Sequence, residues 1–209
     1  MNADEFVDAV CEDNRTALSR LGSSKSLYAD TMGEMDTDTV LTAAAEAEHH
    51  AAETYAAWAD SEPDTEAAEA FAATADEEQD HYEAVVTKLG EHEPSDEVPA
   101  IQTYLRRLEG TTERLGAFVG RTLAAEKSKD QLTGFFVGQA DPQTAQAFRE
   151  MGDDLDAQLE RATSLLADRC DSDEDWDAAL AAAGEAIQAA YDEYTERLEG
   201  MGVNPKPVC

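Results

Sequence analysis

Three acidic residues and one histidine occupy positions where the helical period predicts buried side chains. Glu48, Glu78 and Glu126 each fill a gap in a run of apolar residues spaced three or four apart, and His81 lies at the edge of the run that contains Glu78. The runs are Leu41, Ala44, Tyr55, Trp58; Phe71, Ala75, Tyr82, Val85; and Leu108, Leu115, Val119, Phe136. Three neighbouring helices are therefore each predicted to place one carboxylate in an apolar seam.

Carboxylates in such a seam indicate a bound cation. A lone buried carboxylate costs several kcal/mol unless it is paired, hydrogen-bonded or bound to metal. Carboxylate oxygens together with a neutral imidazole suit iron or manganese. Glu78 and His81 share one side of their helix at i,i+3. Glu48 precedes the turn at 61–63 by about as many residues as Glu78 follows it, so two antiparallel helices would bring these side chains to the same height. By the same reasoning for the next pair of helices, Glu126 would face the segment 150–154.

Each of these residues also has an alternative without metal. Glu48 could be a bundle acid hydrogen-bonded to a tyrosine or an arginine, and Glu126 could pair with Arg121. In so acidic a chain an acidic residue three positions before a histidine arises easily by chance. His49 and His50 are expected to be solvated.

The elements that would position these residues are helices, because strand patterns are absent. Long proline-free runs with helical periodicity predict an all-α bundle of six helices. These are expected at 3–30 (with a possible break near Gly22), 37–60, 63–90, 98–138, 142–169 and 173–200. Pro63 and Pro142 are expected to open helices, Asp171 and Ser172 to cap the last one, and 91–99 to form the longest connection.

Spacing also predicts how the helices assemble. The pairs Gly116/Gly120 and Gly134/Gly138 are expected to allow close helix contact. The expected organisation is an N-terminal helical segment (1–36), a central bundle (37–169) and a C-terminal helix with a short tail (170–209), all in one compact domain.

Composition sets the environment in which these helices fold. Among 209 residues, 47 Asp and Glu against 15 Lys and Arg give a formal charge of −32, and the acids are spread over the whole chain. This pattern is typical of adaptation to molar salt, where a short Debye length screens repulsion. The absence of a basic cluster argues against a nucleic-acid partner. The absence of an 18-residue apolar run or a signal-peptide pattern predicts a soluble, cytoplasmic protein without a membrane partner.

The candidate ligands resemble the half-site of the ferritin-like superfamily, and within it the rubrerythrin group. The likeness covers about 37–169 and is carried by Glu48 in AAEAEHHAAETYAAWA, by Glu78-x-x-His81 in ADEEQDHYEAV and by Glu126 in TLAAEKSKD. It implies a four-helix bundle, here with additional terminal helices, that holds iron (as one or two ions) or manganese. Glu48 and Glu126 would be terminal or bridging ligands, Glu78 a bridge and His81 a terminal ligand. The implied activity is peroxide reduction, Fe(II) oxidation or oxygen chemistry in oxidative-stress defence, with an external electron donor.

The fourth helix departs from that family. Where a second Glu-x-x-His is expected, the chain has the segment 149–154, which lacks a histidine. The apolar period places Met151 and Gly152 inward, and we do not expect Asp153 or Asp154 to turn in. The chain also has no CxxC motif and hence no rubredoxin-type iron site. The site could therefore hold one metal ion, hold two poorly, or be lost, which would leave a helical interaction or regulatory protein. A homodimer is expected in either case.

Overall fold

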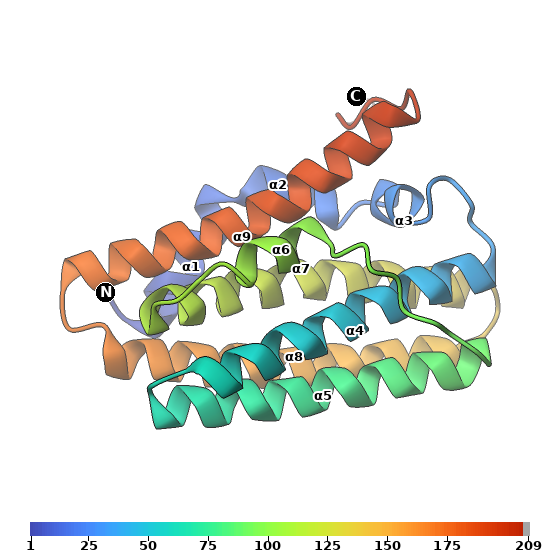
Figure 1. Ribbon diagram of the computed structural model, residues 1–209. Helices are drawn as coiled ribbons and strands as arrows, with labels where there is room; N and C mark the ends of the chain where they lie inside the picture. The colour runs from blue at the N-terminus through green and yellow to red at the C-terminus, as the bar shows by residue number, and fades with distance from the viewer. Residues whose placement is uncertain (207–209) are drawn as a thin grey trace.

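The computed structural model describes residues 1–206, and within that range all regular structure is helical (Figure 1). The last three residues of the expected tail, 207–209, lie outside the described part. The helices are α1 (Ala3–Asp13), α2 (Arg15–Leu21), α3 (Lys25–Asp30), α4 (Thr37–Ser61), α5 (Thr65–Leu89), α6 (Ala100–Leu105), α7 (Thr111–Gly138), α8 (Pro142–Arg169) and α9 (Asp173–Gly200). The predicted all-α class is confirmed.

The long helices α4, α5, α7 and α8 form two antiparallel hairpins. α4 packs along α5, α7 packs along α8, and α5 contacts α8. The segment 90–110, which includes α6, runs back along the bundle, so that α7 starts at the end where α5 started (Figure 1). The bundle therefore consists of two antiparallel hairpins joined by one long crossover, which is one of the known connectivities of four-helix bundles.

The bundle interior contains two apolar clusters with a polar layer between them. One cluster is built around the rings of Tyr55, Phe71 and Phe118, and the other around Phe136 and Phe148. Glu48, Glu78, Lys129 and Gln158 are buried at sequence positions between the two clusters on their respective helices, and Arg121 is buried two turns before Lys129 on α7. The polar layer is therefore continuous across all four helices.

α9 lies over α7 as a second layer, together with the short helices. Gly116 and Gly120 make the α7–α9 contact close, because a Cβ at either position would lie 2.3 Å from the carbonyl oxygen of Ala179 or Ala183. Gly134 and Gly138 have nothing within 4 Å of such a Cβ. The prediction of close contact is thus right for the first glycine pair and wrong for the second.

One core connects the three segments expected from the sequence. The larger apolar cluster includes Phe6 and Leu18 from the N-terminal segment, Phe118 from the bundle, and Trp176 and Ile187 from α9. In the described residues, no helix combines the length and the apolar character needed to cross a membrane.

The expected helix 98–138 is wrong, because residues 106–110 separate α6 from α7. Side chains bond to backbone carbonyls at the break: Trp58 Nε1 donates to Leu105 O at 3.2 Å and Arg114 Nε donates to Leu108 O at 3.0 Å. Gly110 then caps the start of α7. Trp58 is 47 positions from the carbonyl it contacts, so the local sequence carries no sign of that bond.

Other boundaries differ at the N-terminus and at one turn. The expected helix 3–30 is divided at Asn14, which was not expected, and at 22–24, where a break near Gly22 was expected. Pro63 lies in the turn before α5, whose cap is Asp64. Pro142 does open α8 after Asp141, and Ser172 caps α9, both as predicted.

Candidate metal site

Glu48, Glu78 and His81 meet in the polar layer, as predicted. Their exposed fractions are 1%, 0% and 4%. His81 Nδ1 lies 3.9 Å from Glu48 Oε2 and 4.0 Å from Glu78 Oε2, and one ligand atom from each residue lies within 4.8 Å of the others. This group could hold a metal ion.

Local structure explains the convergence. α4 and α5 are joined by a short turn and run antiparallel, so Glu48 and Glu78 come to the same height. Both side chains point into the bundle because they lie on the faces that carry the buried rings of Tyr55 and Phe71. His81 follows Glu78 by one turn and enters the same layer.

Glu126 does not join this group. Its side chain is 24% exposed and lies 3.9 Å from Lys127 Nζ. It lines a hollow together with Asp130, Asp153 and Asp156, away from Glu48 and Glu78. Burial raises its pKa; Lys127 opposes the increase, and Asp156 and Asp130 add to it. The expectation that Glu126 would continue the apolar face is therefore wrong.

Two cationic side chains take the place expected for a third-helix carboxylate. Arg121 is 5% exposed and donates to Glu78 from both ends of its guanidinium, at 2.6 Å to Oε1 and 2.8 Å to Oε2. Lys129, also 5% exposed, donates to Glu48 Oε1. The sequence suggested Glu126 as the partner of Arg121, which in fact pairs with Glu78, and gave Lys129 no role. The signal for both existed, because they are basic residues on a buried helix face in a chain that has few of them.

α8 completes the layer with Asp154 and Gln158. Gln158 is fully buried and its Nε2 donates to Glu78 Oε1 at 3.0 Å. Asp154 Oδ2 lies 3.0 Å from His81 Nε2, although the Asp154 side chain is 56% exposed. Asp154 thus reaches inward from a half-exposed position, contrary to expectation, while Met151 is buried as predicted.

The electrostatics of the two carboxylates differ. Burial acts to raise the pKa of Glu78, but Arg121 outweighs it and holds that pKa below its usual range. Burial raises the pKa of Glu48, and Lys129 only partly offsets the increase. With both acids ionised and both bases protonated, Glu48, Glu78, Arg121 and Lys129 carry no net charge.

Three polar atoms of this layer have no hydrogen-bond partner among the described residues. They are Glu48 Oε2, His81 Nδ1 and Gln158 Oε1, and all three are buried. A cavity of about 310 Å³ reaches the layer from the α3, α6 and α9 side, and its lining includes Glu48, Arg121 and Lys129. A small ion or molecule therefore has a route to Glu48.

These residues do not fit a pair of metal ions. α7 supplies two cations where a carboxylate is required, and α8 supplies an amide and one carboxylate on the far side of His81 but no histidine. A single ion fits better, because the unpaired oxygen of Glu48 and the unpaired nitrogen of His81 face one another.

Comparison with known protein families, curated proteins and solved structures gave no match. The function must therefore be argued from the residues of this chain.

Proposed function

We propose that this chain is a ferritin-like helical protein that binds one divalent metal ion, Fe(II) or Mn(II), through Glu48, Glu78 and His81. The observation that carries the proposal is the pair of buried, unpartnered ligand atoms, Glu48 Oε2 and His81 Nδ1, 3.9 Å apart. Two lone-pair-bearing atoms that face each other in a dry interior are costly unless a proton or a cation lies between them. A hard donor set of two carboxylates and one imidazole favours Fe(II) or Mn(II) over softer ions.

Asp154 supports the same assignment. A histidine that binds metal through one ring nitrogen usually donates from the other nitrogen to a carboxylate, which fixes the tautomer and the ring orientation. Asp154 Oδ2 lies 3.0 Å from His81 Nε2. When Nε2 carries the proton, Nδ1 presents its lone pair to Glu48 and Glu78.

Lys129 is the competitor of the ion in this proposal. Its ammonium bonds to Glu48, so a metal ion must compete for the charge of that carboxylate. Lys129 lines the cavity on one side and the Glu126 hollow on the other, which gives its flexible side chain space in which to move. Arg121 stays on Glu78 and lowers the affinity further, so binding is expected to be weaker than in a carboxylate-rich site.

The chemistry that one such ion would supply is Lewis acidity or a one-electron step. The residues do not provide the second ion that two-metal oxygen or peroxide chemistry would use, so we do not assign that activity. An external electron donor belongs to the proposal only if the ion cycles between oxidation states.

Metal content after anaerobic reconstitution tests the proposal. Protein stripped with a chelator in concentrated KCl should take up one Fe(II) or Mn(II) per chain, measured by elemental analysis after desalting. Glu48→Gln and His81→Gln should abolish uptake, whereas Glu126→Gln should leave it unchanged. Lys129→Met should tighten binding by at least about tenfold, because a unit charge about 4 Å from a divalent ion costs on the order of 8 kcal/mol at an effective dielectric constant of 20.

The second candidate is a metal-free scaffold that works through its surface or its cavity. The observation in its favour is that Arg121 and Lys129 already neutralise Glu78 and Glu48. The scaffold hypothesis predicts that neither the wild type nor Lys129→Met takes up metal during reconstitution. That result would refute the metal proposal, as would loss of uptake in Glu126→Gln.

A further inference from the structure

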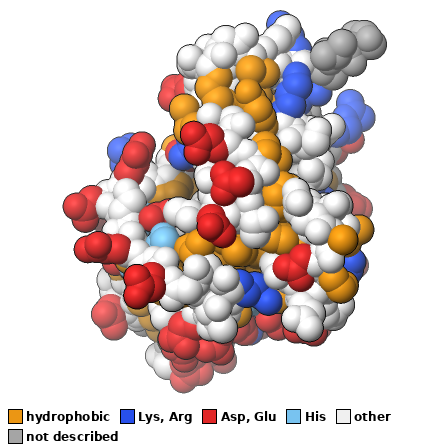
Figure 2. Space-filling view, turned by 90° about the vertical axis from the view of Figure 1, so that its right-hand side faces the viewer, with side chains coloured by type: hydrophobic (Ala, Val, Ile, Leu, Met, Phe, Trp, Pro, Cys, Tyr) orange, Lys and Arg blue, Asp and Glu red, His pale blue; other side chains and the backbone are white. Residues whose placement is uncertain are grey.

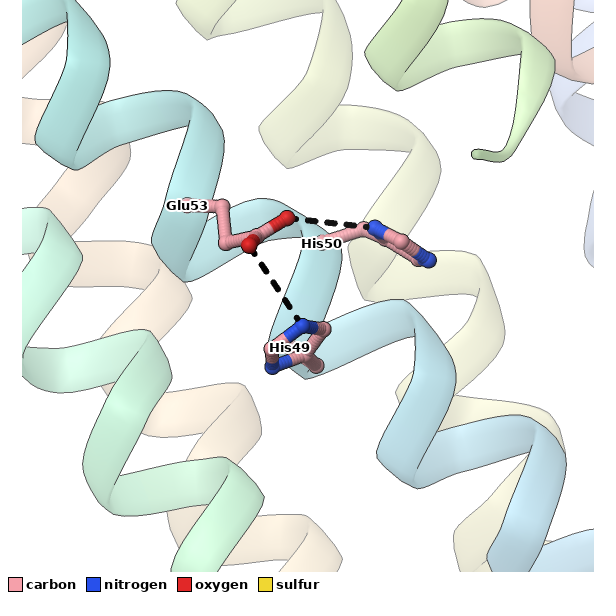
Figure 3. Close-up of side chains that lie close together, drawn as sticks. All are labelled: His49, His50 and Glu53. Carbon is pink, nitrogen blue, oxygen red and sulfur yellow. Dashed lines mark ion pairs between the residues drawn. The ribbon is translucent and has the colours of Figure 1, made fainter. Parts of the chain in front are cut away.

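A second group of possible ligands lies on α4, outside the polar layer. His49, His50 and Glu53 each offer one ligand atom, and these atoms lie within 4.8 Å of one another. Figure 3 shows the Glu53 carboxylate between the two imidazole rings, with an ion-pair line to each. Glu53 is thus the centre of the group. The expectation that both histidines would be solvated is wrong for His50, which is buried.

His50 is the unusual member. It is only 2% exposed, and neither of its ring nitrogens has a hydrogen-bond partner. Buried polar groups in native proteins are nearly always satisfied, and each exception requires a physical reason. His50 Nδ1 lies 3.5 Å from Glu53 Oε2, and His49 Nε2 lies 3.6 Å from Glu53 Oε1, which are separations longer than ordinary hydrogen bonds.

We propose that His49, His50 and Glu53 bind one divalent ion of borderline softness, of the Zn²⁺ class. Two imidazoles and one carboxylate are a common zinc donor set, with a further position open to water or substrate. His49 and His50 are neighbours in the sequence, and Glu53 follows about one turn later on the same helix. The site therefore needs no rearrangement of the backbone. The ion would satisfy His50 Nδ1, which is otherwise buried without a partner.

A carboxylate also lies behind the His50 ring. Glu46 Oε2 lies 3.5 Å from His50 Nε2, the ring nitrogen that does not face Glu53. Glu46 is itself fixed by His92 Nε2 at 3.1 Å and by the backbone N–H of Ser95 at 2.9 Å. A carboxylate behind the ring favours the tautomer with its proton on Nε2 and leaves Nδ1 free for metal.

Arg106 is the cation that competes for this site. Its Nη2 donates to Glu53 Oε2 at 3.0 Å and to the His50 carbonyl at 3.2 Å, while its Nε donates to Thr54 Oγ1 at 3.0 Å. It can release Glu53 and keep its other two contacts. The Glu53 side chain is 51% exposed, so solvent and ions reach the site.

The two candidate sites are separable by mutation. Residues 48 and 50 are two positions apart on α4, which at 100° per residue turns their side chains to nearly opposite faces. Each site also has a histidine that the other lacks: His81 in the polar layer, and His49 on the α4 surface. Failure of one proposal therefore does not imply failure of the other.

Titration of the full-length, chelator-stripped protein with Zn²⁺, and with Co²⁺ as a visible-absorption probe, tests the inference. The wild type should give Co²⁺ absorption typical of nitrogen and oxygen ligands. His49→Gln and Glu53→Gln, both at partly exposed positions, should weaken Zn²⁺ binding by at least about tenfold. His81→Gln should keep the binding at the His49 site, so it is the control histidine outside the triad.

Circular dichroism confirms that each variant is folded before titration. Because His50 is buried, the test rests on His49→Gln and Glu53→Gln and does not need a His50 variant. Unchanged affinity in these two variants would overturn the inference, and so would loss of all Zn²⁺ binding in His81→Gln, which would assign the ion to the polar layer.

Discussion

The pair between Arg121 and Glu78 joins α7 to α5 in the middle of the bundle. Both groups are buried, and each oxygen of Glu78 accepts from the guanidinium. Breaking a buried pair by removing one partner leaves an uncompensated charge, which typically costs about 3–5 kcal/mol. We expect Arg121→Met to lower the free energy of unfolding in urea by that amount.

A surface pair serves as the control. Arg15 pairs with Glu12 at 3.4 Å, but the two side chains are 76% and 69% exposed. Exposed pairs contribute about 0–1 kcal/mol, so Arg15→Met should change the unfolding free energy little. An equal loss in both variants would show that the Arg121 pair has no special role in stability.

The same pair should make stability depend on pH in a defined direction. The folded-state pKa of Glu78 is lowered, with Arg121 outweighing burial. A group with a lowered folded-state pKa stabilises the fold at pH values above its unfolded pKa, about 4.3 for Glu, and loses that contribution as pH falls below it. The difference in unfolding free energy between the wild type and Arg121→Met should therefore become smaller as the pH falls below that unfolded-state pKa.

At the residue scale, the sequence predicted the acids better than their partners. Glu48, Glu78 and His81 interrupt apolar runs, so periodicity alone placed them inward. Arg121 and Lys129 belong to the same kind of face on α7, but a long basic side chain is more often exposed along such a face than buried. Glu126 continues the i,i+4 spacing from Thr122, but it lies one position beyond Ala125, which shares a face with Arg121 and Lys129.

At the scale of elements, the α7–α9 contact depends on two glycines. A Cβ at position 120 would lie 2.3 Å from Ala183 O and 2.9 Å from its Cα, and these backbone atoms cannot move without shifting α9. We expect Gly120→Ala to destabilise the protein by about 1–3 kcal/mol, the usual range for overpacking. Thermal or urea unfolding measures the change.

Gly134 provides a matched control on the same helix. A Cβ there would meet nothing within 4 Å, so Gly134→Ala removes only the backbone entropy cost of a helical glycine. It should stabilise the fold by about 0.5–1 kcal/mol. Stabilisation by both substitutions would mean that α7 and α9 are less tightly packed than the structure indicates.

Element boundaries were predictable where local chemistry sets them. The start of α8 at Pro142 and the cap of α9 at Ser172 follow from short-range rules. The interruption between α6 and α7 depends on Trp58 and on Arg114. Trp58 is 47 positions from the carbonyl it contacts, and no window of local periodicity includes such a donor.

At the scale of the whole molecule, a helical interior with two apolar clusters is enclosed by a chain whose formal charge is −32. Figure 2 shows acidic side chains dispersed around a strip of hydrophobic ones on one face. The all-α fold class, the long helices and the long connection at 91–99 were predictable, because the apolar periodicity of the sequence indicates where helices run and where they are interrupted. The second layer was not, because the small residues of α9 do not identify the helix on which they pack. The homodimer remains a prediction.

The charge of −32 should make folding depend on salt. Self-repulsion of the folded chain weakens as the Debye length shrinks from about 8 Å at 0.15 M salt to about 3 Å at 1 M. We expect the thermal midpoint to rise with KCl, by about 2–4 °C for each kcal/mol gained in a chain of this size. Sucrose, which is excluded from protein surfaces but screens no charge, should not reproduce the whole effect.

Variants with fewer surface acids separate screening from other effects of salt. Asp8, Glu69 and Asp177 are exposed and lie on three different helices. Changing all three to amides leaves the core and the candidate sites intact but lowers the repulsion, so the variant should reach a given thermal midpoint at a lower KCl concentration than the wild type. If the wild type and the variant have the same thermal midpoint at every KCl concentration, repulsion among these acids does not limit stability, and salt acts on the apolar core instead.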